Sequence, residues 1–222
     1  GIYLTNSSDL TITNNTISVG GEYGIYSNDS YNSVVSNNEI TGQYSITIRM
    51  NSCASCHFEG NTLSGNTILE LNYSPNLVIH DNHILDFYDC FYLYDSDSAQ
   101  VTSNEIIKPH SSIIADNQRY WIYNQNSHSA LIEDNVFSIE PGVQAHSDWK
   151  IQAFQSVIKN NSFIVNTPNR SNEYCRIISA NESVISENTF SHTAYYGNRL
   201  NFIYTAGSEN NRSVIENNLI NI

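Results

Sequence analysis

One short phrase recurs along the whole chain, and its spacing restricts the fold more than any other feature. The phrase consists of an apolar pair, a polar step, Asn, any residue, and then Ile, Leu or Phe, as in V-V-S-N-N-E-I ending at Ile40. Successive anchoring asparagines lie 21 to 31 residues apart. A period of this length is typical of a solenoid, in which each repeat forms one coil. The anchoring residues are Asn15, Asn38, Asn61, Asn82, Asn104, Asn135, Asn161, Asn188 and Asn218.

Each unit also holds an apolar segment upstream of the asparagine. Its residues alternate, as in Leu69-Glu70-Leu71, and alternation with a period of two directs successive side chains to opposite faces of a strand. These segments are too short for helices and are rich in Val, Ile, Thr and Tyr, which favours strands. In the first six units the central residue lies 13 positions before the asparagine: Ile2, Ile25, Ile48, Leu69, Phe91 and Ile122.

Short strands that repeat in the same order must stack in parallel. We therefore predict an all-β fold, a right-handed parallel β-helix solenoid of about nine coils, in a single domain over residues 1–222. Longer loops are expected from about residue 105 onward, because the spacing grows after Asn104. The chain opens in mid-pattern without an amphipathic cap, so we expect a fragment of a longer chain, or ends covered by flanking domains or by partners in a homotrimer.

The repeated asparagines are predicted to be structural. Asn tolerates a left-handed backbone conformation at a tight corner, and its amide can bond along a stack of strands. A second polar column is expected to be structural too, with Cys53 replacing its serine in the third unit. Its serines are Ser7, Ser30, Ser74, Ser96 and Ser127.

The Asn phrase and the upstream strand together closely resemble the right-handed parallel β-helix repeat of the pectin-lyase-like superfamily, over essentially the whole chain. That superfamily includes pectate lyases, polygalacturonases, alginate epimerases, phage tailspike depolymerases and non-catalytic surface proteins. The resemblance implies the fold and leaves the activity open.

Charge excludes two classes of partner. The chain has 22 acidic against 9 basic residues, a net charge of −13. Binding to nucleic acid or to an anionic membrane surface requires Lys and Arg, so neither is expected. No run of 18 apolar residues exists, so no membrane span is predicted. The many Asn residues and the 15 Tyr suit a sugar-binding surface, although Asn also suits β-helix turns.

Cys53-Ala54-Ser55-Cys56-His57 matches the C-x-x-C-H haem-attachment motif. The repeat register argues against haem, because the three residues fill ordinary coil positions and a packed coil has no haem pocket. Zinc would need four close ligands, and Cys90 and Cys175 belong to other coils. Buried free thiols are favoured, and a Cys53–Cys56 disulfide is the alternative. We expect no cofactor and no metal ion.

The position just after the central apolar residue should form an outward column of tyrosines that a charge pair interrupts. Stacked tyrosines beside Arg and Glu could bind a glycan and place an acid near the scissile bond. Asp89 and Asp95 are further candidate acids close to the column. The competing interpretation is a surface ion pair among sheet-stabilising tyrosines. The column comprises Tyr3, Tyr26, Arg49, Glu70, Tyr92 and Tyr123.

The longer loops of the later half provide a second candidate region. Insertions at equivalent corners would project on one side and wall a groove. Four aromatic residues there are candidate sugar platforms, and acidic residues and a histidine are candidate acid–base groups. The platforms are Trp121, Trp149, Tyr195 and Tyr196. The acid–base candidates are Glu140, Asp148, His146 and Glu182.

The sequence lacks the G-H-G with R-I-K of polygalacturonases and the D-H-D of alginate epimerases. Our leading hypothesis is an extracellular or virion-surface domain that recognises a polysaccharide or cell-surface glycan. As an enzyme it would be a glycoside hydrolase with a carboxylate pair drawn from Glu70, Asp89, Asp95, Glu140 and Asp148. A non-catalytic structural, adhesin or receptor-binding module is the alternative, and a polysaccharide lyase or epimerase is the weaker one.

Overall fold

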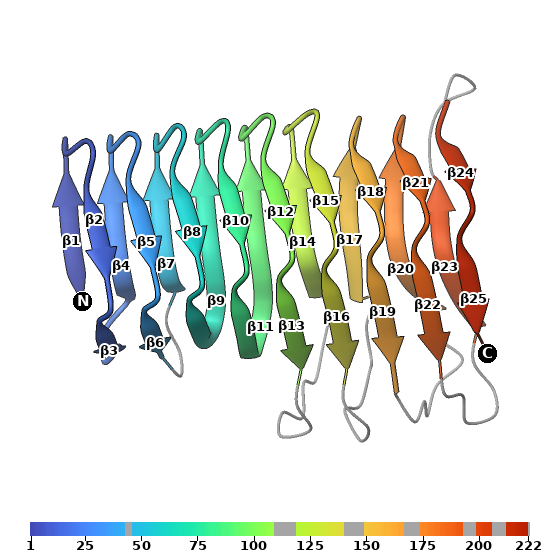
Figure 1. The fold of residues 1–222 in the computed structure, drawn as a ribbon, viewed down its shortest axis with the longest axis horizontal. Coiled ribbons are helices and arrows are strands. Elements are labelled where there is room, and N and C mark those ends of the chain that lie inside the picture. The colour runs from blue at the N-terminus through green and yellow to red at the C-terminus, as the bar shows by residue number, and fades with distance from the viewer. Residues whose placement is uncertain are drawn as a thin grey trace.

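The computed structural model describes residues 1–42, 46–108, 119–139, 149–166, 174–192, 199–205 and 212–221. Within these ranges the chain forms β-strands and no helix, and therefore no helix able to cross a membrane. All strand pairs are parallel, and the strands stack along one axis from β1 at one end to β25 at the other (Figure 1). The predicted fold class, an all-β parallel β-helix, is confirmed. The single domain and the covered ends remain predictions.

Each coil presents three faces in turn. The first face contains the predicted upstream strands. Its members are β1 (Ile2–Thr5), β4 (Tyr23–Asn28), β7 (Ile46–Asn51), the later parts of β9 (Thr62–Asn72) and β11 (His83–Tyr94), β14 (Arg119–Gln125), β17 (Trp149–Phe154), β20 (Tyr174–Asn181) and β23 (Arg199–Thr205).

The second face is a sheet of nine short strands, one from each sequence repeat. They are β2 (Thr11–Thr13), β5 (Val34–Ser36), β8 (His57–Glu59), β10 (Val78–His80), β12 (Gln100–Thr102), β15 (Leu131–Glu133), β18 (Val157–Lys159), β21 (Val184–Ser186) and β24 (Val214–Glu216).

The third face follows the anchoring asparagines. It contains β3 (Thr16–Ser18), β6 (Glu39–Thr41), the first parts of β9 and β11, β13 (Glu105–Lys108), β16 (Val136–Ile139), β19 (Ser162–Val165), β22 (Thr189–His192) and β25 (Leu219–Asn221). Since β9 and β11 run around the corner without a break, the first and third faces form one 16-stranded sheet.

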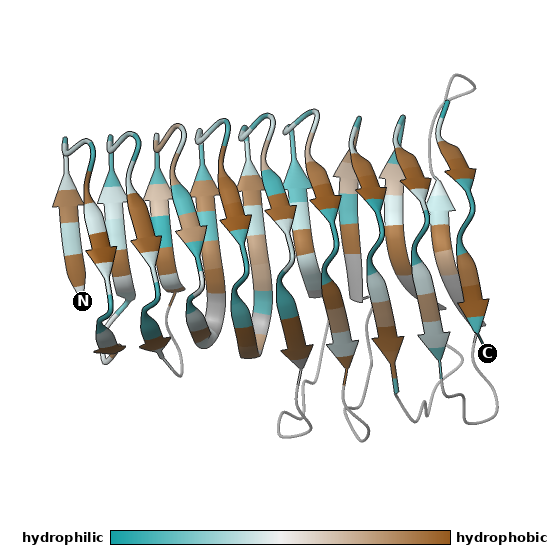
Figure 2. Ribbon diagram, in the orientation of Figure 1, coloured by the Kyte–Doolittle hydropathy of each residue, from teal (hydrophilic) through white to brown (hydrophobic). Residues whose placement is uncertain are grey.

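The core consists of aliphatic and aromatic columns that run through the coils, visible as repeated brown bands in Figure 2. On the third face the column includes three successive phenylalanines, and the Phe137–Phe163 and Phe163–Phe190 rings stack with centroids 5.0 and 4.9 Å apart. On the first face the register pairs continue the predicted column of central residues beyond Ile122 to Ile151, Ile178 and Ile203. Burying such columns supplies the main driving force for folding.

The predicted asparagine ladder is confirmed. In each internal step the side-chain oxygen of one asparagine accepts hydrogen bonds from the backbone N–H and the Nδ2 of the asparagine in the preceding coil. The bonds from Asn61 to Asn82 Oδ1 measure 3.0 and 2.9 Å. The Nδ2 groups also donate to backbone carbonyls, such as Asn82 Nδ2 to Phe58 O at 3.0 Å. The amides therefore satisfy buried polar groups along the corner.

One part of that prediction is wrong. The left-handed backbone conformation belongs to the residue before each anchoring asparagine, as at Asn37 (φ 53°), Gly60 (φ 62°) and Asp81 (φ 53°). The preceding residue makes the turn, which leaves the asparagine side chain free to point into the stack. The serine column forms a similar ladder, in which Ser74 N–H donates to Ser96 Oγ at 3.1 Å.

Candidate functional site

The first face displays the predicted outward column in register. Arg49 pairs with Glu70, and Glu70 pairs with Tyr92 on the next coil. The column extends beyond Tyr123, which the sequence pattern did not indicate. We call the full set the tyrosine column: Tyr3, Tyr26, Arg49, Glu70, Tyr92, Tyr123, Gln152, Ser179 and Tyr204.

A second outward column runs beside it, two residues further along each strand. Sequence reasoning missed this column, although residues two positions apart in a strand point to the same face and the column could have been predicted from that alternation. We call it the amide column because Asn and Gln dominate it. Its members are Thr5, Asn28, Asn51, Asn72, Tyr94 and Gln125, followed by Phe154 and Asn181.

Arg49 and Glu70 form an ion pair at 3.1 Å, as one of the two interpretations predicts. Arg49 Nη1 also donates to Tyr23 Oη at 2.9 Å, and Asn72 Nδ2 donates to Glu70 Oε1 at 3.2 Å. Burial opposes the charged guanidinium, but Glu70 and Tyr23 outweigh it, so the pKa of Arg49 is raised. The carboxylate of Glu70 is therefore held by two partners.

Asp89 is the centre of a tyrosine cluster. It is 8% exposed, and its Oδ1 accepts the backbone N–H of Tyr120 at 3.2 Å. Burial first, and then the charge of Asp89 and a hydrogen bond to it, raise the pKa of Tyr92 well above its ordinary value. The Tyr120 and Tyr123 rings contact each other edge to face, with their centroids 4.6 Å apart, and the ring centroids of Tyr92 and Tyr123 are 5.3 Å apart. Tyr92 is accordingly a hydrogen-bond donor and not a base.

A groove of about 370 Å³ opens between the two columns at the middle of the stack. Aromatic rings, amides and one carboxylate line it, and each group can donate or accept hydrogen bonds or pack against an apolar ring face. The lining residues are Glu70, Asn72, Tyr92, Tyr94, Tyr123 and Gln125.

Several predicted residues lie elsewhere. Asp95 follows Tyr94 at the corner toward the second face, has φ 47° and does not line this groove. Glu182 also sits at this corner, with φ 50°, and accepts a hydrogen bond from Gln155 Nε2 at 2.8 Å. Both acids thus occupy turn positions.

The prediction that Trp121 offers a sugar platform is wrong. Trp121 is 0% exposed and packs in the core, where its ring centroid lies 5.2 Å from that of Phe137 and 5.9 Å from that of Phe163. The strand register shifts between Tyr120 and Ile122, and two consecutive residues, Trp121 and Ile122, are both buried. The surface position was inferred from membership of a long loop, whereas Trp121 lies within strand β14.

The remaining loop candidates are five residues outside the described ranges and one residue at the start of a strand. Glu140, His146, Asp148, Tyr195 and Tyr196 lie outside the described residues. The backbone of Trp149 begins β17. The segments 109–118, 140–148, 167–173 and 193–198 each connect a third-face strand to the next first-face strand, so the insertions do fall at equivalent corners.

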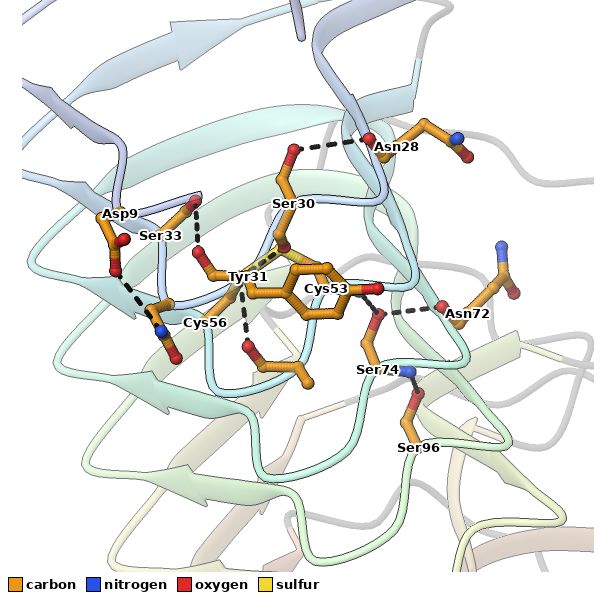
Figure 3. The surroundings of a disulfide bond; sticks show 12 residues. Asp9, Asn28, Ser30, Tyr31, Ser33, Cys53, Cys56, Asn72, Ser74 and Ser96 are labelled. Carbon is orange, nitrogen blue, oxygen red and sulfur yellow. Dashed lines mark hydrogen bonds between the residues drawn. A yellow bond between two sulfur atoms is a disulfide. The ribbon is translucent and has the colours of Figure 1, made fainter. Parts of the chain in front are cut away.

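The C-x-x-C-H motif forms a disulfide, and the prediction of free thiols is wrong for this pair. Cys53 and Cys56 are bonded across a turn between β7 and β8, and both are fully buried (Figure 3). Cys53 N–H donates to Ser74 Oγ at 2.9 Å, so Cys53 takes part in the serine ladder as the register predicts. Cys90 is a buried free thiol whose pKa is raised, mainly by burial. The described residues contain no cluster of three metal-ligating side chains.

Comparison with known proteins agrees with this architecture. Residues 1–109 match the family model described as "right handed beta helix region". No curated protein matches the chain.

Three solved structures of differently named proteins are similar to this chain at low sequence identity. The alginate lyase from Paenibacillus sp. str. FPU-7 has a TM-score of 0.48 and 14% identity, over 84% of this chain and 76% of that one. The Dettilon tailspike protein has a TM-score of 0.42 and 13% identity, over 90% of this chain and 61% of that one.

The catalytic unit of the GH87 alpha-1,3-glucanase from Streptomyces thermodiastaticus has a TM-score of 0.38 and 10% identity, over 97% of this chain and 49% of that one. A shared coil does not transfer an activity, because function depends on the site carried by the fold. The family model matches just under half of the chain, and the parallel coil register continues to β25, so the chain has the fold of a right-handed parallel β-helix.

Proposed function

We propose that the chain is a glycan-recognising domain and that a polysaccharide lies along the first face, between the tyrosine and amide columns. The observation that carries this proposal is the groove in which Tyr92, Tyr94 and Tyr123 alternate with Asn72 and Gln125. Sugars present hydroxyl groups and apolar ring faces, and this combination of amides and aromatic rings complements both.

Recognition is supported more directly than catalysis. Glu70 is bound by Arg49 and Asn72, and Asp89 is buried against Tyr120 and Tyr92. A glycosidase needs one carboxylic acid to donate a proton and a second carboxylate to act as nucleophile or base. Both described carboxylates on this face are already engaged in holding neighbouring side chains.

The proposed location is extracellular or on a virion surface. The Cys53–Cys56 disulfide supports it, because disulfides persist in oxidising compartments and are rare in the cytosol.

Calorimetric titration with a panel of bacterial capsule and O-antigen oligosaccharides tests the proposal. Tyr94→Ala and Tyr123→Ala should each weaken binding by about three- to tenfold, since each removes one ring contact. Tyr31→Ala is the matched control, because Tyr31 is 45% exposed and does not line the groove. Equal affinities for all four proteins would place the binding site elsewhere.

A reducing-end assay on the same glycans separates binding from hydrolysis. We expect no turnover by the wild-type chain. Turnover that is lost in Glu70→Gln or Asp89→Asn would show that the face is a hydrolase site.

A further inference from the structure

The corner between the first and second faces repeats one backbone feature in the first eight coils. The residue just before each serine of the ladder, or before Cys53, has a positive φ between 46° and 56°. This left-handed conformation costs free energy for residues with a side chain, and Asn and Asp tolerate it best. The eight residues are Asn6, Asp29, Ser52, Tyr73, Asp95, Asn126, Gln155 and Glu182.

Tyr73 departs from the composition of this corner. It is the one aromatic residue among the eight, and a positive φ, here 53°, is unusual for so bulky a side chain. Its side chain is 57% exposed, so packing in the core does not account for its presence. Residues held in an unfavourable backbone conformation cluster at binding and active sites. Tyr73 is therefore a candidate for a role other than stability.

The ring of Tyr73 contacts a residue of the central groove. The ring centroids of Tyr73 and Tyr94 are 5.6 Å apart with an interplanar angle of 83°, and Tyr73 N–H donates to Tyr94 O at 2.9 Å. Tyr94 lines the groove, and so does Asn72, the residue just before Tyr73. Tyr73 itself is not in the lining. It thus extends the aromatic surface of the groove sideways, toward the corner.

The neighbours of Tyr73 along the corner are short. Ser52 occupies the equivalent position on the preceding coil and Asp95 on the following one. Neighbouring coils are about 4.8 Å apart, so no bulky side chain flanks the Tyr73 ring at this position on either adjacent coil. An exposed ring with small neighbours offers an apolar surface on which a sugar ring can pack.

We infer that the domain recognises a branched polysaccharide and that Tyr73 binds its side unit. The inference rests on the proposed glycan recognition and adds a requirement for a branch. The main chain lies between the tyrosine and amide columns, parallel to the coil axis. A side unit attached to it projects across the coil, over Tyr94, and packs its ring face on Tyr73. Binding of this unit explains why an aromatic residue occupies a corner that favours Asn, Asp and Ser.

The test compares branched and debranched ligands by calorimetry. Each branched oligosaccharide of the capsule and O-antigen panel is measured beside the same oligosaccharide after an exoglycosidase has removed its side units. At least one branched ligand should bind about fivefold more tightly than its debranched form, as expected for one additional ring contact.

Variants of Tyr73 locate the branch. Tyr73→Ala should weaken binding of that branched ligand by about three- to tenfold and leave the debranched form within about twofold. Tyr73→Phe keeps the ring and should retain the preference for the branched form. Tyr31→Ala is the matched control, because Tyr31 lies at the same corner two coils away, is 45% exposed and does not have a positive φ.

A stability measurement separates binding from a structural role. Tyr73→Asn introduces a residue that tolerates the left-handed conformation, while loss of the exposed ring pair with Tyr94 offsets part of the gain. The thermal unfolding midpoint should therefore stay the same or rise by up to about 3 °C. Affinity for the branched ligand should fall as it does in Tyr73→Ala.

Three results would contradict the inference. Equal affinities of wild type for branched and debranched ligands, both weakened by Tyr94→Ala and Tyr123→Ala, would overturn the branch requirement and preserve glycan recognition at the groove. A lower thermal midpoint for Tyr73→Asn, with both ligand forms weakened equally, would show that Tyr73 is structural. The absence of binding by every ligand of the panel would overturn glycan recognition itself, and the inference with it.

Discussion

Replacing Asn82 by alanine should remove one complete step of the asparagine ladder. Asn82 is 1% exposed, and its Oδ1 accepts two hydrogen bonds from Asn61, at 3.0 and 2.9 Å. Its Nδ2 donates to Phe58 O, His80 O and Asn104 Oδ1 at 2.9 to 3.0 Å. Two accepted bonds and two N–H groups amount to four hydrogen bonds, each contributing about 1 kcal/mol net. The free energy of unfolding should fall by about 4 kcal/mol.

Asn15→Ala is the matched control, because Asn15 occupies the first position of the same ladder. Its backbone N–H keeps its bond to Asn38 Oδ1 after the substitution, and the lost Nδ2 bonds lie near solvent. This variant should lose only about 1 kcal/mol.

Urea unfolding followed by circular dichroism measures both effects. With a slope of about 3 kcal/mol per molar urea, Asn82→Ala should lower the midpoint by about 1.3 M and Asn15→Ala by about 0.3 M. Similar midpoints for the two variants would refute the reasoning, since they would show that a buried amide step matters no more than an exposed one.

Three further predictions concern single contacts. Reduction of the Cys53–Cys56 disulfide should lower the free energy of unfolding by about 2 kcal/mol. The double variant Cys53→Ser, Cys56→Leu should have a thermal unfolding midpoint that reductant does not change. A wild-type midpoint that reductant does not change would contradict the presence of the bond. Glu70→Gln should cost at most about 1 kcal/mol of unfolding free energy, because the pair with Arg49 is partly exposed; a larger loss in thermal unfolding would indicate a structural role. The pKa of Tyr92 is raised in the folded protein, so as the pH rises this tyrosine ionises in the unfolded chain before it ionises in the folded one. The contribution of Tyr92 to the free energy of unfolding is therefore present below pH 10 and declines above it. Tyr92→Phe should flatten that decline in unfolding curves, and an ultraviolet titration in which Tyr92→Phe does not remove a late-titrating phenol would contradict this assignment.

The coil and its ladders could be predicted from sequence because the physical constraint repeats. Every coil must turn the same corner and satisfy the same buried polar groups, so Asn38, Asn61 and Asn82 recur at regular spacing. The tyrosine column followed from the same alternation.

The failures have local causes. Trp121 was assigned to a long surface loop, but it lies in β14, where the register shifts between Tyr120 and Ile122 and two consecutive side chains, Trp121 and Ile122, are buried. The coils of β17 and β20 lost the 13-residue spacing because the corners after these strands contain only two residues each, Gln155 and Ser156 before β18, and Glu182 and Ser183 before β21. The disulfide depends on how closely one turn brings two side chains together, which residue spacing alone does not determine.

No local motif marks the groove of the first face. Tyr94 and Gln125 come from different coils, and only the strand register brings them to one surface.

A crystal structure of the protein with a bound oligosaccharide tests most directly whether the outward columns form the binding surface. We predict that the sugar chain runs parallel to the coil axis on the first face, in contact with Tyr92, Tyr94 and Tyr123. A sugar bound on the nine-stranded second face, or at either end of the stack, would contradict the account.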